Sequence, residues 1–319
     1  VLNLGIPECY AHVRDQMMDI LSHDDIAYIK WDHNRDLVDA GTWPGGRPGV
    51  HEQTLATYRL MDELKERFPG LEIESCSSGG ARVDLGVIER TDRVWVSDCI
   101  DPLERQQMLR WTTQLLPPEL MGSHIASGTS HTTGRTHDLN FRAATAVFGH
   151  FGIEWDIRAA TPAERTELAD WIAFYKAHRE LLLGGDLVRV DFPDDSIVAG
   201  GVVAPDRSRA LYSFATVAWH TPSLLGRLPL PGLDPARRYR VSPVLVGQPP
   251  SGVLPPPWWG VELDLSPESA DAGAGPVPPL RLAGAPSGVV LPGSLLATTG
   301  LIEAPMQPDH VVLYLAEAV

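Results

Sequence analysis

The sequence predicts an incomplete (β/α)8 TIM-type barrel followed by an antiparallel β-sandwich domain. Short apolar runs alternate with segments whose apolar residues recur every three or four positions, a pattern typical of strands that alternate with helices. This alternation stops near Leu183, where proline becomes frequent and β-rich runs take over. We therefore expect about five βα units of the barrel over residues 1–182 and the β domain over residues 183–319.

Five apolar runs mark the predicted strands, near residues 28, 73, 95, 120 and 153, and each precedes a predicted helix. Val1 to Ile6 is expected to end a further strand. The helix after the first loop should bury the face formed by Leu55, Tyr58, Met61, Leu64 and Phe68. The last helix should begin at Thr161, where Pro162 and Glu164 complete a capping box.

The β domain is predicted from the runs SIVAGGVVA, RALYSFATV and HVVLYLAEA. A Pro/Gly/Ala-rich stretch from Ser266 to Gly293 interrupts them, and we expect it to be a surface loop.

Composition excludes several classes of partner. The chain has 26 Lys and Arg against 41 Asp and Glu, a net charge of −15, which argues against nucleic acid and anionic membrane surfaces. No apolar run approaches the roughly 20 residues that cross a bilayer. The three scattered cysteines favour a reducing, cytoplasmic compartment. Because the chain starts at Val1 without a basic and then apolar segment, we expect it to be the C-terminal piece of a longer chain.

Three candidate site residues, Asp32, Cys76 and Asp98, directly follow predicted strands. In a parallel sheet or barrel these strand ends form the active-site rim. Asp32 closes the run DIAYIKWD, and Lys30, two residues earlier, should point to the same side. Lys30 would favour the ionised form of Asp32; an ordinary ion pair of Asp32 with Lys30 or Arg35 is the structural alternative.

Asp98 must be separated from its neighbour Asp101. Asp101 precedes Pro102 and lies three residues before Glu104, so it is predicted to be a helix N-cap. Asp98 has no such duty, and its alternative is an ordinary acid in a strand-end turn. We therefore assign the chemistry to Asp98.

Other candidates have weaker support. SSGGAR lacks the spacing of a P-loop or dinucleotide site, and its glycines are expected to let the backbone approach ligand hydroxyls. Cys76 is expected to be a pocket wall more than a thiol nucleophile. His124 and His131 match no trusted metal spacing. Trp31 and Trp95 are candidates for stacking on a sugar, with core packing as the commoner alternative.

The blocks IKWDHNR, ESCSSGGARVD and WVSDCID, in this order, resemble the signature blocks of the α-galactosidases of glycoside hydrolase family 36. The similarity continues through MGSHIA, HTTGRT and FGHFGIEWDI, so it spans about residues 1–182. The resemblance implies that Asp32 is the nucleophile and Asp98 the general acid/base of a retaining exo-α-galactosidase. It also implies that four residues contact the galactose: Lys30, Asn34, Cys76 and Gly79. No metal or organic cofactor is implied.

The sequence departs from the family pattern at Ser78 and Ala81, which replace glycines, at Cys99, which replaces Asp or Asn, and at His33, which replaces Met. Cys99 is the change expected to alter the acid/base environment. The expected substrates are terminal α-galactosides such as melibiose and raffinose. The alternatives are an α-N-acetylgalactosaminidase, a raffinose-type galactosyl transferase, and a non-catalytic sugar-binding fragment. The sequence leaves a homo-oligomer open.

Overall fold

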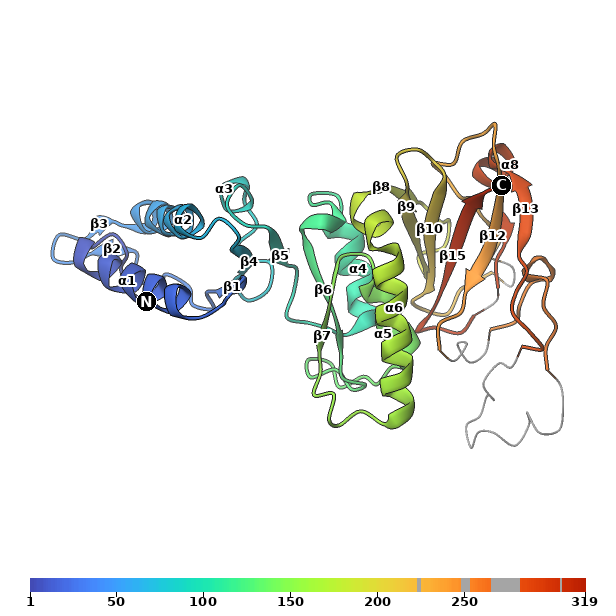
Figure 1. The fold of residues 1–319 in the computed structure, drawn as a ribbon, viewed down its shortest axis with the longest axis horizontal. Coiled ribbons are helices and arrows are strands. Elements are labelled where there is room, and N and C mark those ends of the chain that lie inside the picture. The colour runs from blue at the N-terminus through green and yellow to red at the C-terminus, as the bar shows by residue number, and fades with distance from the viewer. Residues whose placement is uncertain (223–224, 248–252, 265–281, 305) are drawn as a thin grey trace. The chain divides into compact units, whose positions relative to one another are not determined.

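The computed structural model describes residues 1–222, 225–247, 253–264, 282–304 and 306–319 (Figure 1). Contacts divide the chain into two compact units, residues 1–98 with 120–122, and residues 99–119 with 123–319. The expected domain boundary at residue 183 stays a prediction. No helix in the described ranges is long and apolar enough to span a bilayer.

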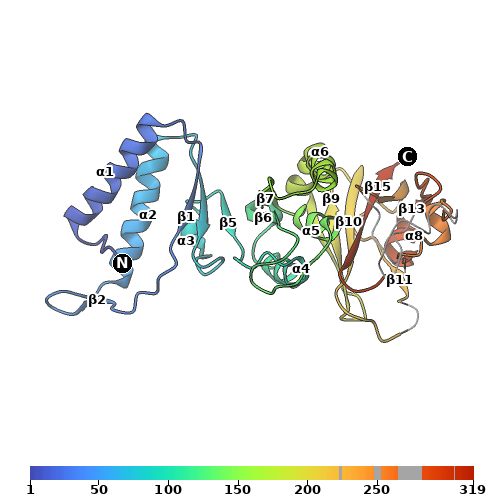
Figure 2. The same cartoon turned by 90° about the horizontal axis from the view of Figure 1, so that it is seen from below.

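The first unit consists of helices packed on parallel strands. Its elements are α1 (Pro7–His23), β1 (Tyr28–Asp32), β2 (Gly41–Thr42), β3 (Arg47–Pro48), α2 (Val50–Arg67), β4 (Glu72–Cys76), α3 (Leu85–Ile88) and β5 (Arg93–Trp95). Strand β4 pairs in parallel with both β1 and β5. Figures 1 and 2 show α1 and α2 side by side. Leu60, Leu64, Ile73 and Val87 form the centre of its apolar core.

Two expectations for this unit are wrong in detail. Val1 to Ile6 forms no strand, because the Ile6 carbonyl already accepts the Tyr10 N–H at the start of α1. The backbone N–H of Leu4 instead donates to Gln53 Oε1 at 2.7 Å. On α2, Leu55 is 51% exposed. The helix buries Ala56, Leu60, Met61 and Leu64. Tyr58 and Phe68 of the predicted face pack partly buried against the same core, so Leu55 is the one member of that face that is wrong.

The five predicted strands are confirmed as one sheet with the order β1-β4-β5-β6-β7. The second unit contributes α4 (Pro102–Thr112), most of β6 (Met121–Ala126), α5 (Leu139–Ala146), β7 (His150–Glu154) and α6 (Pro162–Gly184), and η1 (Pro118–Leu120) precedes β6. The capping box at Thr161 is also confirmed, since Thr161 and Glu164 exchange side-chain and backbone hydrogen bonds. In the described residues β1 and β7 are the edges, so the sheet is an open half-barrel.

An antiparallel sheet follows α6, with the order β13-β12-β15-β10-β9-β8. Its strands are β8 (Asp186–Val190), β9 (Ile197–Val203), β10 (Arg209–Thr216), β12 (Arg238–Val244), β13 (Val289–Pro292) and β15 (His310–Ala318). Leu211 and Leu313 belong to the core shared with α5 and α6. On the opposite face, Tyr212 and Tyr314 lie in a second core. This face is covered by β11 (Arg227–Leu228), η2 (Pro257–Trp259), α8 (Gly293–Thr298) and β14 (Leu301–Ile302).

The three β-rich runs are confirmed as β9, β10 and β15. The surface-loop expectation is wrong for Val289–Pro292, which pairs with β12 as β13 because its apolar residues extend the sheet. Gly293 then begins α8. Residues 266–281 of the expected loop lie outside the described residues.

Candidate active site

Asp32 is the last residue of β1 and lies opposite Cys76 of β4 in the sheet register. Its carboxylate is exposed and accepts a hydrogen bond from Asn34 Nδ2 at 2.8 Å. Partial burial disfavours the charge, but hydrogen bonds from the Cys76 thiol, Asn34 and the His33 backbone hold the pKa of Asp32 below its ordinary value. Asp32 is therefore an ionised carboxylate held at a strand end.

Three side chains hold the turn after β1 against the turn after β4. The Asn34 side chain, which binds Asp32, also accepts the Ser78 N–H at 2.7 Å. Ser77 Oγ donates to the His33 carbonyl at 2.6 Å. Arg82 Nη2 donates to the Trp31 and Cys76 carbonyls at 2.7 and 2.9 Å. Arg82 had no predicted role, although its position at the end of the glycine-rich loop could have indicated one.

The glycines of this loop face the chain itself. Gly79 has φ +77°, and a Cβ there would lie 2.6 Å from Ser97 Cα and 2.9 Å from the Asp98 nitrogen. A Cβ on Gly80 would lie 2.6 Å from the Val96 carbonyl oxygen. The glycines therefore give the segment after β5 room to approach this loop, and the expected approach of ligand hydroxyls to its backbone stays a prediction. The contact brings the backbone of Asp98 against the loop that continues from Cys76.

Lys30 does not form the ion pair with Asp32 that was the structural alternative. Its Nζ lies 3.6 Å from Glu74 Oε1 on the neighbouring strand and 4.3 Å from the ring centroid of Trp95. Its charge lowers the pKa of Asp32 less than the hydrogen bonds from Cys76, Asn34 and the His33 backbone do. Arg35, the other alternative partner, forms no ion pair with Asp32 in the part of the chain that the structure describes.

Both tryptophans pack against the core, which was the commoner alternative to stacking on a sugar. Trp95 is 1% exposed, and its Nε1 donates to Asp98 Oδ1 at 3.0 Å. Trp31 is half-buried against the core of the first unit. Asp98 itself is exposed, three residues beyond the end of β5. Its carboxylate is therefore open to solvent but oriented by one indole N–H.

Asp101 is confirmed as the N-cap of α4, where it accepts the backbone N–H groups of Leu103 and Glu104. The residue is fully buried. Its other carboxylate oxygen accepts hydrogen bonds from Thr133 and from Arg135 Nε, the latter at 2.7 Å. Burial opposes the charge, but these donors hold the pKa of Asp101 below its ordinary value. All of its contacts are structural.

The remaining candidates are one buried thiol and two histidines. Cys76 is 2% exposed, and burial raises the pKa of its thiol to about 11, so it is a poor nucleophile at neutral pH. His124 Nδ1 lies 3.1 Å from Glu154 Oε2. His131 is exposed. Across the described ranges, no three His, Cys, Asp or Glu side chains form a group suited to a metal ion.

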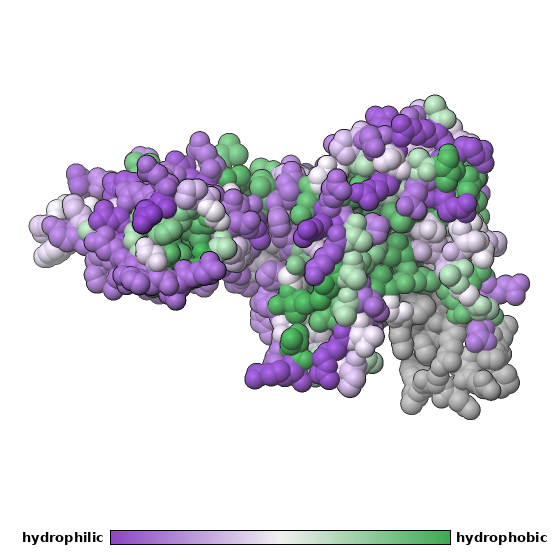
Figure 3. Space-filling view, in the orientation of Figure 1, coloured by the Kyte–Doolittle hydropathy of each residue, from purple (hydrophilic) through white to green (hydrophobic). Residues whose placement is uncertain are grey.

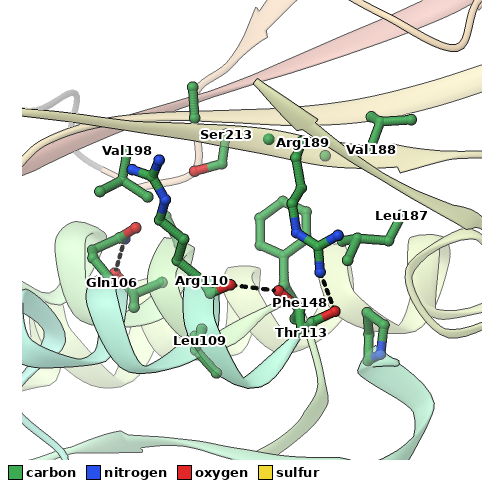
Figure 4. A pocket seen from close by; sticks show the side chains of 16 residues that line it. Gln106, Leu109, Arg110, Thr113, Phe148, Leu187, Val188, Arg189, Val198 and Ser213 are labelled. Atoms are coloured by element: carbon green, nitrogen blue, oxygen red, sulfur yellow. Dashed lines mark hydrogen bonds between the residues drawn. The ribbon is translucent and has the colours of Figure 1, made fainter. Parts of the chain in front are cut away.

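Two hollows differ in their relation to these residues. One of about 670 Å³ lies between α1, α2 and β1, is lined mostly by apolar side chains and borders Lys30 and Asp32. Figure 3 shows apolar residues in a hollow at this end of the first unit. The other, of about 100 Å³, lies between α4, α5, β8 and β9. There Arg189 donates to the Thr113 carbonyl at the end of α4 (Figure 4). This second hollow contains none of the predicted site residues.

A parallel half-barrel that carries two carboxylates at its strand ends is typical of glycoside hydrolases. The family model described as Melibiase matches residues 1–185. An α-galactosidase of Escherichia coli is 44% identical over 241 residues, 76% of this chain and 34% of that protein. Alpha-galactosidase C of Emericella nidulans is 36% identical over 244 residues, 76% of this chain and 32% of that protein. The chain belongs to the Melibiase family.

Solved structures agree with this assignment. The family 36 α-galactosidase AgaA of Geobacillus stearothermophilus has a TM-score of 0.81 at 27% identity, over 100% of this chain and 39% of that one. A variant of AgaA solved with raffinose has a TM-score of 0.81 at 26% identity, with the same coverage. The chain thus spans about a third of the length of the curated relatives it matches.

Proposed function

We propose that the protein is a retaining exo-α-galactosidase that hydrolyses terminal α-galactosides such as melibiose and raffinose. The observation that carries the proposal is the pair of strand-end carboxylates: Asp32, kept ionised by its donors, and Asp98, exposed and oriented by Trp95. The family assignment and the raffinose bound to a variant of AgaA support the substrate class.

The two carboxylates have different duties in a double displacement. Asp32 attacks the anomeric carbon while Asp98 gives its proton to the departing glycosidic oxygen, so the C–O bond breaks as a bond to Asp32 forms. Asp98, now ionised, takes a proton from water. As this proton leaves, the water oxygen attacks the anomeric carbon and the bond between that carbon and Asp32 breaks. Two inversions give net retention, and the reaction needs no metal or organic cofactor.

The galactose contacts proposed from the family resemblance fall on residues that also organise the site. Lys30 presents a partly exposed ammonium beside Asp32 on the same face of β1. Asn34 and Cys76 donate to Asp32. Gly79 holds the loop against Asp98. We propose that sugar hydroxyls meet these groups at the strand ends.

The test measures hydrolysis by the full-length protein. We expect release of galactose from melibiose and raffinose, with the α-anomer appearing first in the NMR spectrum of the products. Release from an aryl α-N-acetylgalactosaminide alone would assign the rival specificity, and transfer to sugar acceptors without hydrolysis would assign a transferase. Binding of galactose without turnover would contradict the proposal.

The three free cysteines favour a reducing environment, so we also propose a cytoplasmic location.

A further inference from the structure

A buried carboxylate lies on the same face of the sheet as the nucleophile. Glu74 is the third residue of β4 and only 1% exposed. In the register of the sheet Glu74 pairs with Lys30, and the next pair that points to the same face is Asp32 with Cys76. Burying a carboxylate is costly unless a cation or donors compensate it. Glu74 therefore calls for an explanation that its place in the core does not give.

Glu74 restrains the ammonium group of Lys30. Lys30 Nζ lies 3.6 Å from Glu74 Oε1 and over the face of Trp95, 4.3 Å from its ring centroid. An ammonium group has three N–H donors, and the Lys30 side chain remains 36% exposed. The carboxylate and the ring thus fix one side of the ammonium and leave its other side open to solvent.

The same contacts reach the second catalytic candidate. Trp95, which lies beneath Lys30, donates its indole N–H to Asp98 Oδ1 at 3.0 Å. A cation over a tryptophan face is attracted to it by the electrons of the ring. The chain of contacts from Glu74 through Lys30 to Trp95 ends at Asp98, and Lys30 also contributes to the low pKa of Asp32.

The space around Glu74 permits little movement. A Cβ on Gly122 would lie 3.0 Å from both Glu74 Oε2 and Trp95 Cε3, so the side chains of Glu74 and Trp95 fill the room above this glycine. Glu74 also forms a hydrogen bond with Tyr28 of β1. Burial, and to a lesser extent this hydrogen bond, raise the pKa of Tyr28. Glu74 is therefore packed in one orientation, with Oε1 toward Lys30.

We propose that Glu74 is a positioning residue for both carboxylates. It holds the Lys30 ammonium beside Asp32 and over Trp95, and through Trp95 it fixes the orientation of Asp98. The inference rests on the proposed function, since it assigns a role within that site. The proposed role differs from a purely structural one because the effect of Glu74 on catalysis must pass through Lys30.

The test is a double-mutant cycle in the full-length protein. Glu74→Gln should lower kcat/KM for an aryl α-galactoside by about tenfold, within the range of coupling between contacting residues. In a Lys30→Met background the same change should cost less than about twofold, because the partner is already gone. Equal losses in the two backgrounds, or wild-type activity of Glu74→Gln, would overturn the proposal. Glu72→Gln, on the same strand but exposed, is the matched control and should keep wild-type activity.

A second measurement separates positioning from lost stability. Partial unfolding lowers the rate on every substrate equally, whereas a misplaced Asp98 harms poor leaving groups most. The ratio of kcat/KM for raffinose to that for the aryl galactoside should therefore fall about threefold or more in Glu74→Gln. An unchanged ratio would count against the proposal.

If Glu74→Gln does not fold, Gly122→Ala replaces it. That variant keeps every charge and displaces Glu74 and Trp95, and the same fall in the substrate ratio is expected. An unchanged ratio in Gly122→Ala would overturn the proposal. A wild-type protein that hydrolyses no α-galactoside would instead refute the proposed function, which keeps the two failures apart.

Discussion

Asp32 in the first unit and Glu303 in the β domain are carboxyl groups in opposite environments. Asp32 is exposed at the end of β1, and its hydrogen-bond donors lower its pKa. Glu303 is 4% exposed, and burial raises its pKa to about 8 even though Tyr314 donates to it at 2.8 Å. The first is a carboxylate at neutral pH, and the second is mostly a neutral acid.

Chemistry and stability place opposite demands on these two carboxyl groups. Donors around Asp32 preserve a charge that faces solvent. Around Glu303, Trp259 and Tyr314 form an apolar core that disfavours the charge. Removing the charge of Asp32 should therefore end catalysis, whereas removing the ionisable group of Glu303 should increase stability at high pH.

The largest expected effect is that of Asp32→Asn. The change is nearly isosteric and removes the attacking charge, so kcat should fall on the order of 10⁴-fold or more. The circular dichroism spectrum and melting temperature should stay close to wild type. Asp36→Asn, in the exposed loop that follows, is the matched control and should be fully active. Substantial activity in Asp32→Asn would remove Asp32 as the nucleophile.

Asp101→Ala tests the other acid of the WVSDCID block. The change removes an N-cap and leaves Arg135 without a buried partner, so the free energy of unfolding should fall by about 2–4 kcal/mol. Chemical denaturation measures this directly. The folded fraction should retain its kcat for an aryl galactoside; loss of kcat at unchanged stability would mean that Asp101, not Asp98, performs the chemistry.

Asn34→Ala should have a smaller effect, with a defined pH signature. Asn34 donates to Asp32 and helps to lower its pKa, so its removal should raise that pKa. The acidic side of the kcat/KM profile requires ionised Asp32 and should move to higher pH. At neutral pH the loss should be about tenfold, the worth of roughly one hydrogen bond to a charged group. A profile that does not move would show that Asn34 does not tune the nucleophile.

Glu303→Gln should have the smallest effect on catalysis and leave kcat/KM at the wild-type value. An unfolded Glu titrates near about 4.3, whereas burial raises the pKa of Glu303 to about 8. The folded state binds the proton more tightly, so the wild type loses stability as pH rises from about 4.3 through 8. The variant lacks this loss, so its melting temperature relative to wild type should rise by several degrees between pH 5 and pH 8 and level off at higher pH. A constant difference would mean that Glu303 does not titrate in this range.

Local patterns in the sequence predicted much of the fold. The N-cap at Asp101 and the capping box at Thr161 involve residues within three positions of each other, so the sequence alone contains their geometry. The partner of Lys30 was not predictable in this way, because Glu74 lies on another strand whose register the sequence does not give. Arg82 was missed for the same reason, since it contacts the carbonyl of Trp31, 51 residues away.

We propose that Asp98 is the acid/base and Asp32 the nucleophile of a double displacement, and azide rescue of Asp98→Ala is the decisive experiment. In the full-length protein this variant should lose raffinose hydrolysis almost entirely, because a poor leaving group needs the proton. An activated aryl galactoside should still form the glycosyl-enzyme on Asp32, which azide then releases. We expect the α-galactosyl azide as the product, with restored turnover. The β-azide, or no rescue by azide, would contradict the proposal.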